Sequence, residues 1–110
     1  MKYILILSIS FICIFPNNVF AACGGVSCTD VKITRMSVTA NGNTIISTSG
    51  DESKLSCDAG SAGYITLDPN SKNYNATYSL ILTAHTTAHS LWVRTTESGP
   101  CQVIYVVSDK

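Results

Sequence analysis

Four cysteines limit what this chain can fold into more than any other feature. Cys23, Cys28, Cys57 and Cys101 follow an apolar N-terminal segment, and a fifth cysteine, Cys13, lies inside that segment. An even number of cysteines in a small exported domain is typical of a disulfide framework. A domain this small buries a limited share of its surface and is marginally stable without cross-links. We therefore expect two disulfides in a small, loop-rich fold.

Four cysteines allow three pairings, of which we favour Cys57–Cys101 with Cys23–Cys28. Residues 24 and 25 are both glycine, which allows the short loop between Cys23 and Cys28 to turn tightly. The chain-entropy estimate assigns about 4 kcal/mol to the long loop and about 2 kcal/mol to the short one. A zinc site is not expected, because no pair has Cys-x-x-Cys spacing and export favours oxidation.

The N-terminus has the features of a secretory signal peptide. Lys2 supplies a positive charge, residues 3–15 are almost all apolar, and residues 16–18 break the run. This run is shorter than the roughly 20 residues that a spanning helix needs. We predict a leader with cleavage after Ala21 or Ala22.

Removal of residues 1–22 leaves residues 23–110 as one disulfide-stabilised domain, secreted or periplasmic and without a membrane span. The length of 110 residues is too short for more than one domain. Two alternatives stay open, an uncleaved membrane anchor and a lipoprotein. Residues 20–23 faintly resemble a lipobox, and lipidation of Cys23 would leave one thiol free.

The charge balance excludes some classes of partner. The chain has seven basic and seven acidic side chains, for a formal net charge of zero. A nucleic-acid binder needs a basic surface for phosphates, and a membrane-surface protein needs a polybasic segment. Polarity comes mainly from Ser, Thr and Asn, which suits neutral or weakly charged ligands such as glycans.

Apolar–polar alternation predicts a series of short strands. A shift in parity near Arg35 and Met36 indicates a bulge in the first, and Asn41-Gly42 predicts a hairpin turn. The last strand is apolar on both faces, which predicts a central strand or one covered by a partner subunit of a homo-oligomer. The predicted strands are residues 31–38, 44–48, 64–67, 91–95 and 101–107.

One helix is predicted, with Asn70, Ser71 or Asn73 as its N-cap and its end near Thr87. Tyr74, Tyr78, Ile81 and His85 recur at helical spacing, although residues 74–84 also alternate as a strand would. Length favours the helix, because a strand from 73 to 87 would be unusually long. The order is three strands, a helix and two strands. We predict a β-rich α+β fold, either a small five-stranded OB-like barrel with its helix between strands 3 and 4 or a curled open sheet.

Part of the chain resembles known families. Residues 78–84 (Tyr-Ser-Leu-Ile-Leu-Thr-Ala), residues 91–94 (Leu-Trp-Val-Arg) and the later Cys101 follow the order found in a family of small exported bacterial proteins of largely unknown function. The arrangement is also similar to the OB-fold B subunits of pentameric AB-type toxins, in which a mid-chain cysteine pairs with the late one. The resemblance spans roughly residues 55–107, with Ala88 where the family usually has glycine. No sugar-binding motif matches residue by residue, so no binding residue is carried over.

Two pairs of residues are candidate functional sites. Trp92 and Arg94 share the face opposite Leu91 and Val93, where an indole can stack on a sugar while a guanidinium donates hydrogen bonds. His85 and His89 have the spacing of metal ligands on a helix or of a small nuclease's acid–base pair, but no third ligand is near and few basic residues are available for phosphate. We predict no metal, no cofactor and no catalytic residue.

The function predicted from the sequence is an exported, non-enzymatic binding domain for a glycan or a protein. The alternatives are a small secreted hydrolase, such as a nuclease using His85 and His89, and a structural protein of the periplasm or envelope. A resemblance of fold does not by itself choose among them.

Overall fold

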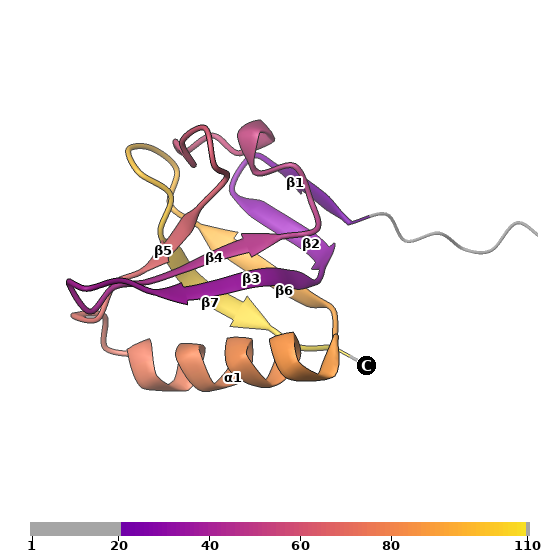
Figure 1. Cartoon of the computed structure of the whole chain (residues 1–110). Helices are drawn as coiled ribbons and strands as arrows, with labels where there is room; N and C mark the ends of the chain where they lie inside the picture. The colour runs from indigo at the N-terminus through magenta and orange to yellow at the C-terminus, as the bar shows by residue number, and fades with distance from the viewer. Residues whose placement is uncertain (1–20, 110) are drawn as a thin grey trace, which may run out of the picture.

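The computed structural model describes residues 21–109 and contains seven strands, one α-helix and one short 3₁₀ helix (Figure 1). The predicted leader lies almost wholly outside the described residues, which include only its last two positions, Ala21 and Ala22. Within the described part no helix is long and apolar enough to cross a membrane. In chain order the elements are β1 (Ala22–Gly24), β2 (Ser27–Val31), β3 (Ile33–Val38), β4 (Thr44–Thr48), η1 (Glu52–Lys54), β5 (Ile65–Leu67), α1 (Tyr74–Thr87), β6 (Leu91–Thr95) and β7 (Val103–Val107).

The strands form two antiparallel sheets, as Figure 1 shows. One has four strands in the order β1-β2-β6-β7, and the other has three in the order β3-β4-β5. Lys32 alone separates β2 from β3, so a single stretch of chain passes from one sheet to the other. The Lys32 backbone N–H donates to the Ser49 hydroxyl at 2.9 Å, and the Lys32 carbonyl accepts from the Ser49 N–H at 2.9 Å.

The predicted five-stranded barrel with its helix between strands 3 and 4 is wrong. Neither sheet closes, and α1 follows the fifth strand. The helix lies within the predicted part of the chain, but β1 and β2 come earlier in the chain and were not predicted as separate strands. Between β5 and β7 there is one isolated parallel bridge, Thr66↔Gln102, where a closed barrel needs a continuous ladder.

Local backbone irregularities account for the missed strands. The segment from Cys23 to Cys28 was predicted to be a tight loop, yet β1 and β2 pair across it with Cys23 opposite Cys28. Further along β2, the register against β6 shifts between Cys28 and Val31, where Asp30 has a φ of 51°. The predicted bulge near Arg35 is found as a register shift between Ile33 and Arg35. Bulges of this kind bend a strand and increase its twist.

The helix α1 lies alongside β3 and β7, the outer strands of the two sheets (Figure 1). Its residues Thr77, Ile81 and Ala84, at helical spacing, are buried. Asn73 precedes the helix, but its side chain makes no capping bond and instead donates from Nδ2 to the Ile104 carbonyl at 3.0 Å. The helix ends at Ala88, which adopts the left-handed conformation.

The core lies between the two sheets and α1 and contains both disulfides. The favoured pairing is confirmed, with Cys23 bonded to Cys28 and Cys57 bonded to Cys101. All four cysteines are buried. The large apolar side chains that are almost fully buried are Val31, Ile46, Ile65, Leu67, Ile81, Leu91 and Val93.

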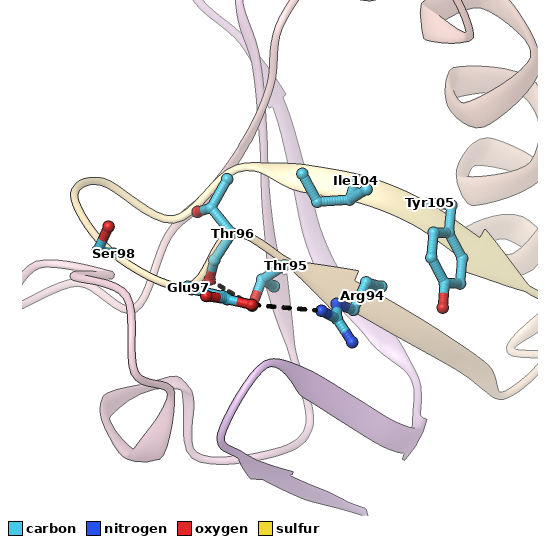
Figure 2. Close-up of a pocket in the computed structure, with 7 residues that line it drawn as sticks. All are labelled: Arg94, Thr95, Thr96, Glu97, Ser98, Ile104 and Tyr105. Atoms are coloured by element: carbon cyan, nitrogen blue, oxygen red, sulfur yellow. Dashed lines mark hydrogen bonds and ion pairs between the residues drawn. The ribbon is translucent and has the colours of Figure 1, made fainter.

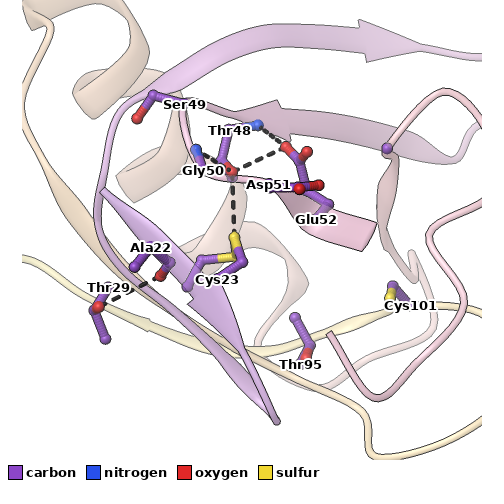
Figure 3. The surroundings of a disulfide bond; sticks show 12 residues. Ala22, Cys23, Thr29, Thr48, Ser49, Gly50, Asp51, Glu52, Thr95 and Cys101 are labelled. Atoms are coloured by element: carbon purple, nitrogen blue, oxygen red, sulfur yellow. Dashed lines mark hydrogen bonds between the residues drawn. A yellow bond between two sulfur atoms is a disulfide. The ribbon is translucent and has the colours of Figure 1, made fainter. Parts of the chain in front are cut away.

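A buried carboxylate supports the Cys23–Cys28 disulfide (Figure 3). Glu52 in η1 accepts hydrogen bonds at Oε1 from the Thr48 backbone N–H at 2.6 Å and the Thr48 hydroxyl at 2.9 Å. The Thr48 hydroxyl lies 3.7 Å from Cys23 Sγ and accepts from the Gly50 N–H at 3.2 Å. Burying a carboxylate is costly unless it is hydrogen-bonded, and these two donors meet that requirement. The network fixes η1 and the end of β4 against β1.

Candidate functional site

The predicted alternation of β6 is confirmed and sets the orientation of the site. Leu91, Val93 and Thr95 are buried, and Trp92 and Arg94 are half-buried on the opposite face. Val93 pairs with Cys28 of β2, so the strand beside β6 carries the Cys23–Cys28 disulfide. One face of β6 therefore packs into the core while its other face stays accessible.

Tyr105 of β7 completes the face that carries Trp92 and Arg94. It pairs directly with Arg94 in the antiparallel register, so the two side chains share one face. Its ring centroid lies 5.4 Å from that of Trp92, with the planes tilted by 41°. Aromatic rings at this separation and tilt attract each other. Trp92 thus supports the Tyr105 ring from one side.

An open cleft of about 650 Å³ lies beside Arg94 and Tyr105 (Figure 2). One wall is apolar, formed by Ile104 and Tyr105, which are 46% and 41% exposed. The other wall is polar and comes from the end of β6 and the loop that follows. Its residues are Arg94, Thr95, Thr96, Glu97 and Ser98.

Arg94 is the charged group best placed to meet a ligand in the cleft. Its Nη2 lies 3.9 Å from Glu97 Oε1, which is an ion pair but beyond hydrogen-bonding distance. The Glu97 side chain is 79% exposed, and exposed pairs contribute little to stability. The guanidinium and the carboxylate therefore keep hydrogen-bonding capacity for a ligand.

Thr96 and the second disulfide hold the loop that forms the polar wall. The Thr96 hydroxyl donates to the Pro100 carbonyl at 3.1 Å and accepts from the Gln102 N–H at 3.1 Å. Its backbone N–H donates to the Gln102 carbonyl at 3.0 Å, next to the bonded Cys101. These bonds fix both ends of the loop.

The two predicted site residues have different positions in this geometry. Arg94 lines the cleft, whereas Trp92 packs beside the Tyr105 ring and does not line it. Sequence reasoning missed Tyr105 because its place beside Arg94 depends on the register between two strands. The apolar run at residues 103–107 did not reveal the exposure of Tyr105 either, because it indicated a central strand or one covered by a partner subunit.

The two histidines join separate parts of the chain. His85 lies in the last turn of α1, and its Nδ1 donates to the Ile33 carbonyl at 2.8 Å. His89 lies beyond the helix end, as predicted, and its Nε2 donates to the Asp109 carbonyl at 3.0 Å. No group of three or more metal-ligating side chains comes together in residues 21–109. The hydrolase that would use these histidines stays a prediction.

Comparisons of the chain with known protein families, with curated proteins and with solved structures found no match. The resemblance to small exported bacterial proteins and to toxin B subunits therefore stays a prediction, and no residue role is taken from it.

Proposed function

We propose that this chain is an exported, non-enzymatic binding domain that holds a glycan in the cleft beside Arg94 and Tyr105. The observation that carries the proposal is the pairing of Arg94 with Tyr105 across β6 and β7 at the wall of an open cleft. A glycan presents both apolar ring faces and hydroxyl groups, and this cleft offers a partner for each.

Each wall of the cleft has a distinct role in the proposed binding. The exposed ring of Tyr105, supported by Trp92, packs against the apolar face of a sugar ring. Arg94 donates hydrogen bonds to sugar oxygens, and Glu97 accepts from sugar hydroxyls. A ligand of this kind needs no high net charge on the protein, in agreement with the formal charge of zero.

The two disulfides support a location outside the reducing cytoplasm. Disulfides persist in oxidising compartments such as the periplasm and the extracellular medium. The bond of Cys23 to Cys28 also argues against the lipoprotein alternative, because a lipidated Cys23 has no thiol left for a disulfide.

Screening the purified, disulfide-bonded chain on a glycan array tests the proposal, followed by titration of the retained glycan. Tyr105→Ala and Arg94→Ala should each weaken binding about tenfold or more, which corresponds to about 1.4 kcal/mol. The loss of stacking explains the first effect and the loss of donors explains the second.

The other sheet offers a matched control. Arg35 Nη1 donates to the Tyr64 hydroxyl at 3.2 Å, so Arg35→Ala and Tyr64→Ala remove the same residue types away from the cleft. These variants should bind like the original chain. A screen without glycan hits, or equal losses in all four variants, would contradict the proposal. Retention of a protein by the cleft, lost in Tyr105→Ala, would replace the glycan with a protein ligand.

A further inference from the structure

Within residues 21–109, Arg94 and Glu97 form the only ion pair between side chains. Both residues line the open cleft, and Figure 2 shows their charged groups pointing toward each other. An exposed pair of this kind contributes little to stability, because water screens the attraction and both side chains lose freedom. The main consequence of the pair at this position is therefore its effect on the charge of the cleft.

The neighbours of Arg94 on the sheet are uncharged. It lies opposite Ser27 of β2 and opposite Tyr105 of β7, and Trp92 precedes it on the same face of β6. A guanidinium in such surroundings is suited to bidentate contacts with carboxylate, phosphate or sulfate groups. With Arg94 alone, the cleft would carry a positive charge and would favour anionic ligands.

Glu97 cancels the positive charge of the cleft. Its Oε1 lies 3.9 Å from Arg94 Nη2, and the other residues that line the cleft are threonine, serine, isoleucine and tyrosine. The bonds of the Thr96 hydroxyl to Pro100 and Gln102 hold the backbone of the loop. The Glu97 side chain itself is 79% exposed, so a ligand that reaches the guanidinium also meets the carboxylate.

Charged and uncharged ligands differ in how they meet this pair. An anionic group bound to Arg94 would lie close to the Glu97 carboxylate, so repulsion would offset the attraction. A sugar hydroxyl both donates and accepts hydrogen bonds. An uncharged sugar can therefore accept from Arg94 and donate to Glu97 at the same time.

We infer that Glu97 makes the cleft selective for uncharged glycans and excludes sugars that carry a carboxylate, sulfate or phosphate group. This inference rests on the proposed function, because it names the class of glycan that the same cleft binds. Glu97 is then a specificity-determining residue. Removal of its charge should admit acidic sugars, whereas removal of Arg94 should weaken the binding of every sugar.

The test compares the original chain with Glu97→Gln, each purified in its disulfide-bonded form. Glutamine keeps a side-chain oxygen that accepts from hydroxyl groups but removes the charge. The probes are methyl glucoside with methyl glucuronide, methyl galactoside with methyl galacturonide, and inorganic sulfate. Each sugar pair differs only in a hydroxymethyl group that is replaced by a carboxylate. Titration followed by nuclear magnetic resonance gives each dissociation constant.

The original chain should bind the uncharged member of each pair more tightly than the acidic member. Two unit charges about 4 Å apart in water change a binding constant about fivefold. In Glu97→Gln the preference should therefore shift toward the acidic member about fivefold, and sulfate binding should strengthen by a similar factor. Added salt should reduce both changes, and Glu97→Gln/Arg94→Ala should lose the gain for sulfate.

Asp109→Asn is the matched control, because it removes the same charge beyond the end of β7. His89 bonds to the backbone carbonyl of Asp109, which the substitution keeps. This variant should keep the sugar preference and the sulfate affinity of the original chain.

Several results would overturn the inference: an original chain that prefers the acidic sugars, an unchanged preference or unchanged sulfate binding in Glu97→Gln, or the same shift in Asp109→Asn. A different result would contradict the proposed function. If the original chain binds no sugar, here or on the array, while Glu97→Gln still gains affinity for sulfate, the glycan is wrong and Glu97 remains the residue that excludes anions from the cleft.

Discussion

Ala88 holds a backbone conformation that glycine adopts more readily. It ends α1 with φ 55° and ψ 34°, and its backbone N–H donates to the Ala84 carbonyl. In the left-handed backbone conformation the β-carbon of an L-residue crowds the backbone, at a cost of about 1–2 kcal/mol. Glycine avoids that cost but loses more entropy on folding, by about 0.4–1 kcal/mol.

Ala88→Gly should therefore raise the free energy of unfolding by about 0.5–1 kcal/mol. The measurement is the midpoint of urea unfolding at an unchanged slope. Ala76→Gly is the matched control, because Ala76 is exposed inside the same helix and the change there should destabilise by about 1 kcal/mol. Equal effects at both positions would contradict the role of the left-handed conformation.

Single residues in this chain were predictable where their environment is local. The face shared by Trp92 and Arg94 follows from alternation along one strand, and β6 has it. Tyr105 was not predictable in the same way, because its neighbours Arg94 and Trp92 belong to another strand. Its position depends on the β6–β7 register, which shifts between Arg94 and Thr95.

Among the elements, the short helix η1 depends on the charge of Asp51. Asp51 Oδ1 accepts from the Ser53 hydroxyl at 2.5 Å and from the Ser53 backbone N–H at 3.1 Å. The bond from the Ser53 side chain, then that from its backbone, lowers the pKa of Asp51 below its ordinary value of 3.8. The folded state therefore binds fewer protons than the unfolded state near this pH.

The stabilisation that Asp51 provides should be complete above its ordinary pKa of 3.8 and should disappear as the pH falls through the lower value of the folded state. We expect Asp51→Asn to be less stable than the original chain at pH 6, with a difference that fades on acidification. Thermal unfolding of both proteins from pH 6 to about pH 2 measures this. Asp51 is exposed, so the difference is small. A difference that is independent of pH would contradict the argument.

Strand and helix prediction succeeded where the signal lies within one segment. The strands at Thr44–Thr48 and Leu91–Thr95 have their predicted bounds. The helix ends at Thr87 as predicted and begins after Asn73, which is one of the three candidate N-caps. The last predicted strand begins two residues later than expected, at Val103, and lies at a sheet edge, so the prediction of a central strand is wrong. The apolar residues that suggested a central position are the exposed Ile104 and Tyr105. Edge and centre differ only in pairing, which the local pattern does not contain.

At the scale of the whole molecule, the Cys57–Cys101 disulfide joins the connections that precede β5 and β7. Next to it, Asp58 and Pro100 form a parallel bridge, and the Thr66 N–H donates to the Cys101 carbonyl at 2.9 Å. These few contacts are where the three-stranded sheet meets the end of the four-stranded one. A covalent bond at a seam without a continuous ladder limits how far the sheets can separate.

Removing that disulfide should cost more stability than removing the other. The Cys57–Cys101 bond spans 44 residues and the Cys23–Cys28 bond spans 5. Loop-closure entropy then predicts losses of about 4 kcal/mol for Cys57→Ala/Cys101→Ala and about 2 kcal/mol for Cys23→Ala/Cys28→Ala. Urea unfolding of the two double variants measures both. The first variant should also weaken the proposed glycan binding, because Cys101 fixes one end of the loop that forms the polar wall of the cleft. The Cys23→Ala/Cys28→Ala variant should keep the proposed binding under conditions in which it is folded. A larger loss of stability in the second variant would mean that packing around Cys23, Thr48 and Glu52, and not loop length, decides the stability of this fold.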